Sequence, residues 1–335
     1  MATARCFLKI KIIMSNKNLS KIPKLNMSVL PTPMHKLENL SRGLFGNVYC
    51  KRDDLTGFAF GGNKTRKLDY LVADALMKGC DTLIGIGANQ SNFCRMASGA
   101  GVVNSFDVHL VLGGSKPEKP TGNLLIDYLL GAKIHHVESE EWNVWEEKGK
   151  ELEKELTKEG RKVYWMPIGG SSPVGALGYV SAFMEIMEDC KRIGIEFDYI
   201  VHATGSAGTQ AGLLVGREMT GWKGDIIGMA VAKSKEQLTE EIYGLANETG
   251  KQLGVSINKD DVIVDDSFIG EKYGAITPEG AKAVSLFARK EGILLDYVYT
   301  GKAAAGLINY SRRSIFTERN NVLFIHTGGN IQLFS

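Results

Sequence analysis

Short apolar runs alternate with longer amphipathic stretches along most of this chain, from about Leu30 onward. The runs "DTLIGIGA", "DVHLVLGG" and "FDYIVHATGS" are typical of buried strands, and the stretches between them carry apolar residues at helical spacing. This βαβα order predicts parallel sheets joined by right-handed crossovers. Two such sets follow one another. We therefore expect an α/β protein with two doubly wound open parallel-sheet domains and a cleft where strand ends meet helix starts.

The composition excludes several classes of function. With 335 residues the chain is long enough for about two domains, and its net charge is only +2. This balance gives no reason to expect nucleic acid or a membrane surface as a partner. The five cysteines include no CxxC pair, and His109, His135, His136 and His326 show no ligand spacing, so we expect no metal site. Scattered reduced thiols favour a cytoplasmic protein.

The first 26 residues are basic and contain no acidic side chain. We expect residues 1–26 to be a flexible leader. A transit peptide that directs the protein to mitochondria and a true start at Met14 are the alternatives. No run of 18 uncharged apolar residues occurs, so no membrane span is expected.

Several junctions between expected strands and helices are rich in glycine, and the fullest is "TGSAGTQAG". Its backbone N–H groups precede a helix, where unsatisfied donors and the helix dipole favour an anion. The stretch lacks the lysine of a Walker loop and the G-x-G-x-x-G pattern of nicotinamide-binding folds. Neutral donors suit a single phosphate monoester, which suggests pyridoxal phosphate. This loop supplies the expected phosphate ligands Thr204, Gly205, Ser206, Ala207, Gly208 and Thr209.

Pyridoxal phosphate requires a lysine for its Schiff base, and "GGNKTRK" contains the best candidate. Lys64 stands at an expected helix start, two glycines precede it closely, and Asn63 can donate a hydrogen bond to a ring hydroxyl. An ordinary surface lysine remains the alternative from local pattern alone.

Longer motifs carry a family resemblance. In order along the chain they are "KRDDLTGFAFGGNKTRKLDYL", "GANQSN", "GGSSPVGALGYV", "GILLDYVYTGKAAAGL" and "LFIHTGG". Together they closely resemble the pyridoxal-phosphate family of D-cysteine desulfhydrases and 1-aminocyclopropane-1-carboxylate deaminases. The resemblance implies a tryptophan-synthase-β-like fold (fold type II), a homodimer, and a cofactor between two domains. The large domain would comprise residues 27–64 and 175–335, and the small domain residues 65–174.

The resemblance also implies roles for individual residues. Lys64 matches the Schiff-base lysine, and Asn63 matches the residue beside the cofactor's 3-hydroxyl. Gln90, Ser91 and Asn92 match residues that hold the substrate carboxylate, and Ser91 also matches a hydroxyl discussed as catalytic. Tyr273 and Tyr299 match two active-site tyrosines.

Thr300 follows Tyr299, where deaminases of the family typically carry Glu and desulfhydrases Thr. A carboxylate there favours a protonated pyridine nitrogen and hence a strong electron sink, whereas a neutral hydroxyl gives a weaker one. Elimination of a good leaving group can proceed with the weaker sink, so Thr300 favours elimination. Thr327 is a second hydroxyl that could reach the ring, and the choice between the two stays open.

Two further features bear on the substrate and the site. Phe93 stands where desulfhydrase-like members often carry His, which indicates an altered pocket, and Cys94 is expected to be a small buried residue. The stretch "EEWNVWEEKGKELEKELTKEG" is expected to form a charged helix with a solvated face and no binding site.

These observations predict a lyase that converts D-cysteine, or a similar β-substituted amino acid, into pyruvate, ammonia and sulfide. The alternatives are deamination of 1-aminocyclopropane-1-carboxylate to 2-oxobutyrate and ammonia, and L-cysteate sulfo-lyase activity. A catalytically silent binding protein of the same fold is a further alternative, against which the intact Lys64, Ser91 and both tyrosines argue.

Overall fold

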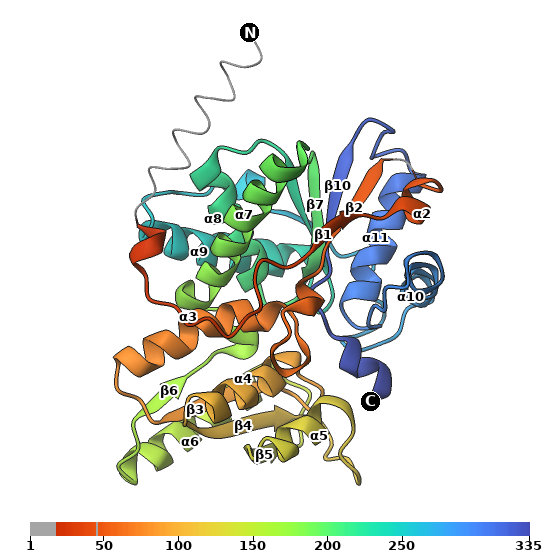
Figure 1. Ribbon diagram of the computed structural model, residues 1–335. Coiled ribbons are helices and arrows are strands. Elements are labelled where there is room, and N and C mark those ends of the chain that lie inside the picture. Colours follow the sequence, from red (N-terminus) through yellow and green to blue (C-terminus); the bar gives the residue numbers. More distant parts are fainter. Residues whose placement is uncertain (1–17, 45) are drawn as a thin grey trace.

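A computed structural model describes residues 18–44 and 46–335 of the chain, and two separate sheets organise them (Figure 1). Both sheets are covered by helices, so the predicted pair of doubly wound units is confirmed. All strands of the smaller sheet lie within residues 65–174 and all strands of the larger sheet lie outside them. The domain boundaries themselves stay a prediction.

The larger sheet has six strands in the order β1-β2-β10-β7-β8-β9. Its strands are β1 (Met34–Lys36), β2 (Asn47–Lys51), β7 (Tyr199–Thr204), β8 (Asp225–Ala230), β9 (Ile263–Asp265) and β10 (Asn321–Ile325). All neighbours are parallel except β1 and β2. The link between these two strands holds only the one-turn helix α2 (Glu38–Ser41), which is too short for a parallel crossover.

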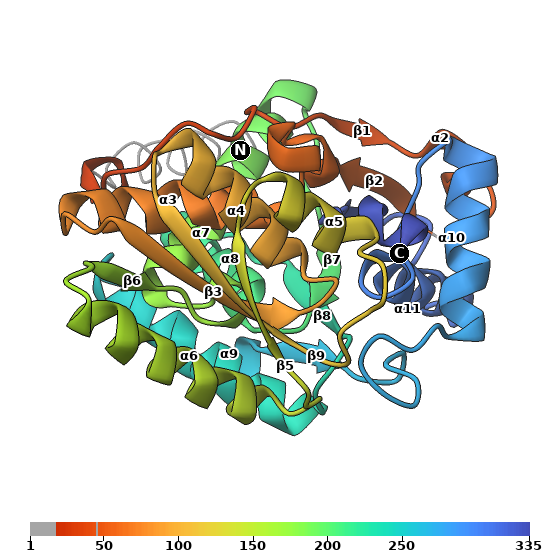
Figure 2. The same ribbon diagram turned by 90° about the horizontal axis from the view of Figure 1, so that it is seen from below.

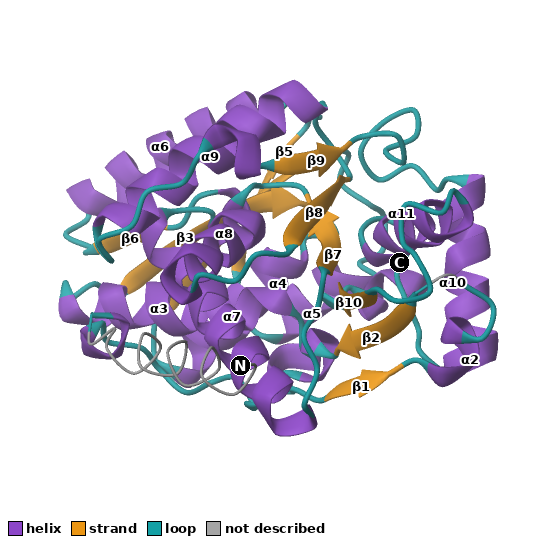
Figure 3. Ribbon diagram, turned by 90° about the horizontal axis from the view of Figure 1, so that it is seen from above, coloured by secondary structure: helices purple, strands orange, loops and turns teal. Residues whose placement is uncertain are grey.

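Helices cover both faces of the six-stranded sheet, as Figure 3 shows from above, and an apolar core lies on each face. One face packs against α7 (Pro173–Ile193), α8 (Gly208–Thr220) and α9 (Lys235–Lys251). The other packs against α2, α10 (Pro278–Glu291) and α11 (Thr300–Arg312). Thr277 caps α10, since its hydroxyl accepts from the backbone N–H of Gly280.

The smaller sheet has four parallel strands in the order β5-β4-β3-β6. They are β3 (Thr82–Ala88), β4 (Asp107–Gly113), β5 (Lys133–Val137) and β6 (Val163–Trp165). The helices α3 (Asn63–Met77), α4 (Asn92–Val103) and α5 (Gly122–Leu129) lie on one face, and α6 (Trp142–Lys158) lies on the other (Figure 2).

The predicted leader is only partly described, because residues 1–17 lie outside the described residues. Leu19 and Ile22 pack against the core of the larger sheet, and the N–H of Leu25 donates to the carbonyl oxygen of Asp69 at 2.8 Å. Within the described part, no helix has the length and apolarity that a membrane span requires.

A buried ionic network fixes the position of α3 between the two sheets. The Arg66 guanidinium, on α3, donates to both carboxylate oxygens of Asp53 at 2.8 and 2.9 Å and to both of Glu185 at 3.0 Å. Glu185, on α7, also pairs with Lys51 of β2 at 2.6 Å. Burial alone would raise the pKa of Glu185, but Arg66 and Lys51 lower it to about 2. The network therefore joins three elements through fully ionised groups.

We expect Arg66→Met to lower the free energy of unfolding by about 3–5 kcal/mol, because it leaves two buried carboxylates without their main partner. The matched control is Arg192→Met, which removes an arginine whose side chain is 65% exposed and pairs with Asp189. Its cost is expected to stay within about 1 kcal/mol. Denaturant midpoints measure both variants, and equal losses would contradict the role given to the network.

Candidate active site

One pocket lies where strands of both sheets end and the following loops begin. The carboxyl ends of β3 and β7 and the loops that follow β6 and β10 contribute to its wall. Most of the predicted site residues line it, namely Asn63, Lys64, Ser91, Asn92, Thr204, Gly205, Ser206, Ala207, Thr209, Tyr273, Tyr299 and Thr327. A ligand site at the carboxyl ends of parallel strands is the position expected for open α/β sheets.

Three predicted site residues do not line this pocket. The Gln90 side chain accepts from the N–H of Asn123 at 2.8 Å and donates to the carbonyl oxygen of Thr121 at 3.1 Å, so it fixes the start of α5. The N–H of Gly208 donates to the carbonyl oxygen of Ser206 at 2.7 Å. Both residues support the loops that carry the pocket wall.

Thr300 is the third, and its hydroxyl points to Asp296 instead. The Thr300 Oγ donates to the Asp296 carboxylate at 2.6 Å and accepts from the Asp296 N–H at 2.9 Å. Both residues are fully buried at the start of α11. The contact between Thr300 or Thr327 and the pyridine nitrogen stays a prediction.

Lys64 lies in the first turn of α3, and its amine faces the pocket. The helix start is fixed from the larger sheet, because the N–H of Asn63 donates to the carbonyl oxygen of Thr327 at 2.9 Å. The Asn63 amide donates to the Thr209 hydroxyl at 3.1 Å, next to the glycine-rich loop. Burial lowers the pKa of Lys64 to about 8, so a far larger fraction of its amine is neutral near physiological pH than in an ordinary lysine.

Lys67 is a second lysine of the site, which the sequence analysis missed. It lies one helical turn after Lys64, is fully buried, and donates to the carbonyl oxygen of Gly169 at 3.2 Å. Burial and the neighbouring Lys64 lower the pKa of Lys67 well below its ordinary value. Within the described residues neither lysine forms an ion pair. The signal available in the sequence was the i, i+3 spacing, which puts both lysines on one helix face.

The glycine-rich loop lies next to this lysine pair and forms a cradle for an anion. The loop leads into α8, whose first backbone N–H groups lack partners within the helix. Ser171 donates to the Ser206 hydroxyl at 2.9 Å, and the Thr204 hydroxyl is buried without a hydrogen-bond partner among the described residues. A phosphate would satisfy Thr204, the helix start and the buried Lys67 amine together. The residues present therefore fit the phosphate of the expected cofactor.

Ser91 and Asn92 form the wall between β3 and α4. Ser91 caps α4, because its hydroxyl accepts from the N–H of Cys94 at 3.2 Å. Gly87 leaves the space that this requires, since a Cβ there would lie 2.5 Å from the Ser91 hydroxyl oxygen. The Asn92 side-chain oxygen accepts from the Asn123 amide at 2.9 Å. The Ser91 hydroxyl, the Asn92 amide and the N-terminus of α4 are together suited to bind a carboxylate.

The two predicted tyrosines meet in the pocket. The hydroxyls of Tyr273 and Tyr299 hydrogen-bond to each other, although they come from different loops of the larger domain. Burial raises the pKa of both hydroxyls. Both tyrosines are therefore neutral at physiological pH and can donate a proton.

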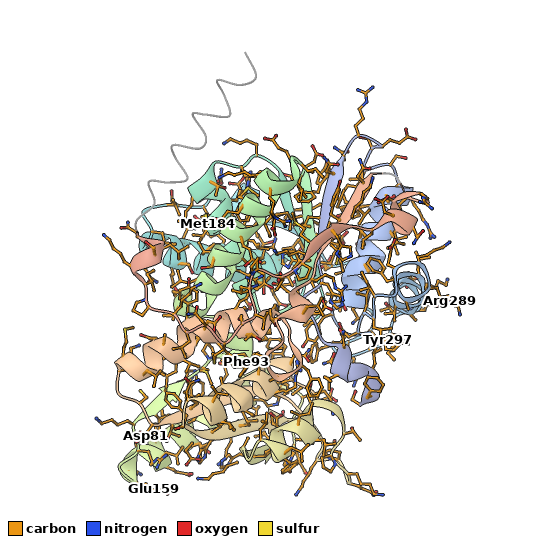
Figure 4. All side chains as sticks on the ribbon, viewed as in Figure 1. Asp81, Phe93, Glu159, Met184, Arg289 and Tyr297 are labelled. Atoms are coloured by element: carbon orange, nitrogen blue, oxygen red, sulfur yellow. The ribbon has the colours of Figure 1, made fainter. Side chains whose placement is uncertain are left out.

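The rest of the pocket wall is aromatic. This finding contradicts the prediction that the charged helix, α6, has no binding site. Trp142 and Trp145, from the helix expected to bind nothing, both line the pocket. Trp142 meets the edge of Tyr273 with ring centres 6.0 Å apart, and the Lys233 ammonium lies 4.8 Å from the Trp142 ring centre. The charged pattern of α6 describes its outer face, whereas its tryptophans face inward. The buried Phe93 completes the apolar surface, and Figure 4 labels it between α3 and α4.

Cys94 and His326 occupy positions where they contribute to packing and hydrogen bonding within the fold. Cys94 is buried, as predicted, and burial raises the pKa of its thiol. His326 accepts from the N–H of Gly328 and has its other ring nitrogen 2.9 Å from the carbonyl oxygen of Leu294. No group of side chains able to hold a metal ion occurs among the described residues.

Comparison with known proteins agrees with this geometry. Residues 25–328 match the family model of pyridoxal-phosphate dependent enzymes. A candidate 1-aminocyclopropane-1-carboxylate deaminase of Pyrococcus furiosus is 43% identical over 93% of each chain. A D-cysteine desulfhydrase of Klebsiella pneumoniae is 38% identical over 96% of this chain and 98% of its own. The crystal structure of a homologue of 1-aminocyclopropane-1-carboxylate deaminase superposes with a TM-score of 0.89 at 39% identity, covering 97% of this chain and 96% of that one.

Fold and site together define a pyridoxal-phosphate-dependent lyase of fold type II. The chain belongs to the family of 1-aminocyclopropane-1-carboxylate deaminases and D-cysteine desulfhydrases. A fungal L-serine ammonia-lyase from Rhizomucor miehei shares the fold at 16% identity, with a TM-score of 0.68 over 90% of this chain and 94% of that one.

The lowered pKa of Lys64 has a measurable consequence. We expect cofactor-free protein to bind pyridoxal phosphate covalently at a rate that rises with pH and levels off above about 8, because only the neutral amine attacks the aldehyde. Near pH 7.4 roughly a fifth of such an amine is neutral, against about one part in a thousand for an ordinary lysine. Stopped-flow absorbance measures the rate, with Lys64→Ala as the control that forms no such bond. A rate still climbing at pH 10 would contradict the assignment.

The role of Lys67 can be separated from that of Lys64 by omitting the phosphate. We expect Lys67→Met to weaken the affinity for pyridoxal phosphate about 10- to 100-fold, the typical loss for a charge-assisted hydrogen bond. Its affinity for pyridoxal, which has no phosphate, should be unchanged. Equilibrium titrations of both ligands measure this. Equal weakening of the two would show that Lys67 supports the fold of the site and not the phosphate.

Proposed function

We propose that this lyase catalyses the α,β-elimination of D-cysteine, or of a similar small β-substituted amino acid, to pyruvate, ammonia and sulfide. The observation that carries the proposal is Thr300, a neutral hydroxyl after Tyr299 where the resemblance leads one to expect Glu in deaminases. The Thr300 hydroxyl lies outside the pocket lining, next to Tyr299, and is hydrogen-bonded to Asp296 at 2.6 Å, which supports its role as a neutral group at this position. The relative of Klebsiella pneumoniae named as a D-cysteine desulfhydrase supports the same substrate.

Bound pyridoxal phosphate supplies an electron sink that stabilises negative charge at the substrate's Cα. The protein's own groups provide binding and proton transfer. Ser91 and Asn92 hold the carboxylate at the start of α4. The Lys64 amine, with its lowered pKa, removes the Cα proton. The neutral Tyr273 and Tyr299 hydroxyls face the same space and donate a proton to the departing sulfur.

The elimination breaks the Cα–H and Cβ–S bonds and forms a carbon–carbon double bond. Water then replaces the amine, so cysteine and one water give pyruvate, ammonia and hydrogen sulfide. The aromatic wall of Phe93, Trp142 and Trp145 limits access of water to the pocket while these steps proceed.

Deamination of 1-aminocyclopropane-1-carboxylate is the second candidate, because the relative of Pyrococcus furiosus carries that name at 43% identity. This substrate has no Cα proton for Lys64 to remove, so ring opening demands a stronger electron sink. Among the described residues that line the pocket none carries a carboxylate, and the Asp296 carboxylate accepts hydrogen bonds from the start of α11.

One preparation assayed with both substrates distinguishes the candidates. We expect pyruvate and sulfide from D-cysteine, with kcat/KM at least about tenfold above that for 2-oxobutyrate release from the cyclopropane substrate, which corresponds to a difference of about 1.4 kcal/mol in barrier. L-Cysteine, D-serine and L-cysteate in the same panel define handedness and leaving group. Faster 2-oxobutyrate formation would reverse the order of the two candidates.

A further inference from the structure

Arg95 is a buried cation close to the active site that the chemistry above does not use. Arg95 lies on α4 and is fully buried. Burial lowers the pKa of its guanidinium to about 10, while the nearby Asp127 has the opposite, smaller effect. Among the described residues Arg95 forms no ion pair, and no hydrogen bond joins it to Asp127. A buried guanidinium without a carboxylate partner is costly, so its remaining contacts need explanation.

Those contacts go to the loop that carries Lys64. The Nη1 group donates to the carbonyl oxygen of Ala59 at 2.6 Å, and the Nη2 group donates to the carbonyl oxygen of Gly61 at 3.2 Å. The two N–H groups of one planar guanidinium thus hold two carbonyls of one loop, a geometry that a lysine cannot reproduce.

This loop has an unusual backbone. Ala59, Phe60, Gly61 and Gly62 have φ values of +43°, +67°, +71° and +129°, so four residues in succession have positive φ. Two of them are not glycine, and such residues are strained unless the surroundings hold them. The loop leads directly into Asn63 and Lys64 at the start of α3.

Arg95 also reaches the other half of the site. Its Nη2 group lies 3.5 Å from the side-chain oxygen of Asn92, one helical turn earlier on α4. Asn92 lines the pocket beside Ser91, where the substrate carboxylate is expected. One side chain therefore contacts both the loop that aims the lysine and the residue next to the carboxylate position.

We propose that Arg95 is a positioning residue of this lyase. Its guanidinium keeps residues 59–62 in their left-handed conformation and so fixes the direction of Lys64 relative to Asn92. The proposal rests on the role of Lys64 as the cofactor lysine and holds whichever amino acid is the substrate. A purely structural Arg95 would contribute to stability without affecting how Lys64 reacts.

Three variants test this proposal. Arg95→Met removes both loop contacts, and Arg95→Lys keeps the charge but cannot hold two carbonyls with one planar group. Ala100→Gly is the matched control, because it weakens α4 at a buried position that does not line the pocket and whose side chain cannot hydrogen-bond to the loop. Thermal unfolding of each variant reports stability, and stopped-flow absorbance reports the rate at which cofactor-free protein binds pyridoxal phosphate through Lys64.

We expect Ala100→Gly to lower the melting temperature without changing the rate of cofactor capture. Arg95→Lys should slow capture by at least about tenfold, and Arg95→Met by about 100-fold, the scale of loss for a misplaced reacting group. On the active substrate kcat should fall more than KM rises. Since capture is measured without substrate, a wrong substrate assignment leaves this test intact. If Arg95→Lys captures the cofactor and turns over substrate at wild-type rates, the proposal is overturned. This outcome is decisive even when Arg95→Met does not fold.

Discussion

The geometry of the active site depends on how α3 is held between the two sheets. The helix presents Lys64 to the pocket and Lys67 to the carbonyl oxygen of Gly169 behind it, while Arg66 enters the network with Asp53 and Glu185. Those carboxylates come from the segment after β2 and from α7, both parts of the larger domain. A small rotation of α3 would break several short charged contacts in a dry interior, where they are strong. The ionic network therefore fixes the direction of both lysines before any ligand binds.

The same arrangement sets the electrostatics of the pocket. The Asp53 and Glu185 carboxylates face Arg66, and among the described residues Lys64 and Lys67 form no ion pair. Desolvation then lowers the pKa of both lysines, and the neutral Lys64 amine is the nucleophile that covalent cofactor binding needs. A bound phosphate would restore a counter-charge beside Lys67. The protein thus separates Lys64, with about a fifth of its amine neutral near pH 7.4, from Lys67, whose amine would become charged beside a phosphate.

The sequence predicts the parts of this site that depend on local pattern, and it misses those that depend on distant packing. Strand and helix alternation predicts both sheets, and motif order identifies Lys64, Ser91 and the tyrosine pair, which the fold brings into one pocket. The proposed role of Arg95 depends on the carbonyl oxygens of Ala59 and Gly61, in a loop whose backbone has positive φ values. The residue types alone do not predict this loop conformation. Trp142 was missed because the average character of α6 is charged, although its first turn faces inward. Gln90 sits within a motif whose other members line the pocket, yet packing turns it towards α5.

The carboxylate of Asp296 is bound by the start of α11 and does not line the pocket. Its two oxygens accept the backbone N–H groups of Val298, Tyr299 and Thr300 and the Thr300 hydroxyl, all between 2.6 and 2.8 Å. Its charge is therefore balanced by the positive end of the helix and is not directed at the pocket. The nearby groups that face the pocket are the neutral hydroxyls of Tyr273 and Tyr299, which can donate a proton but stabilise a pyridinium poorly. A departing thiolate needs such a donor, whereas opening a cyclopropane ring needs the stronger sink that a free carboxylate would support.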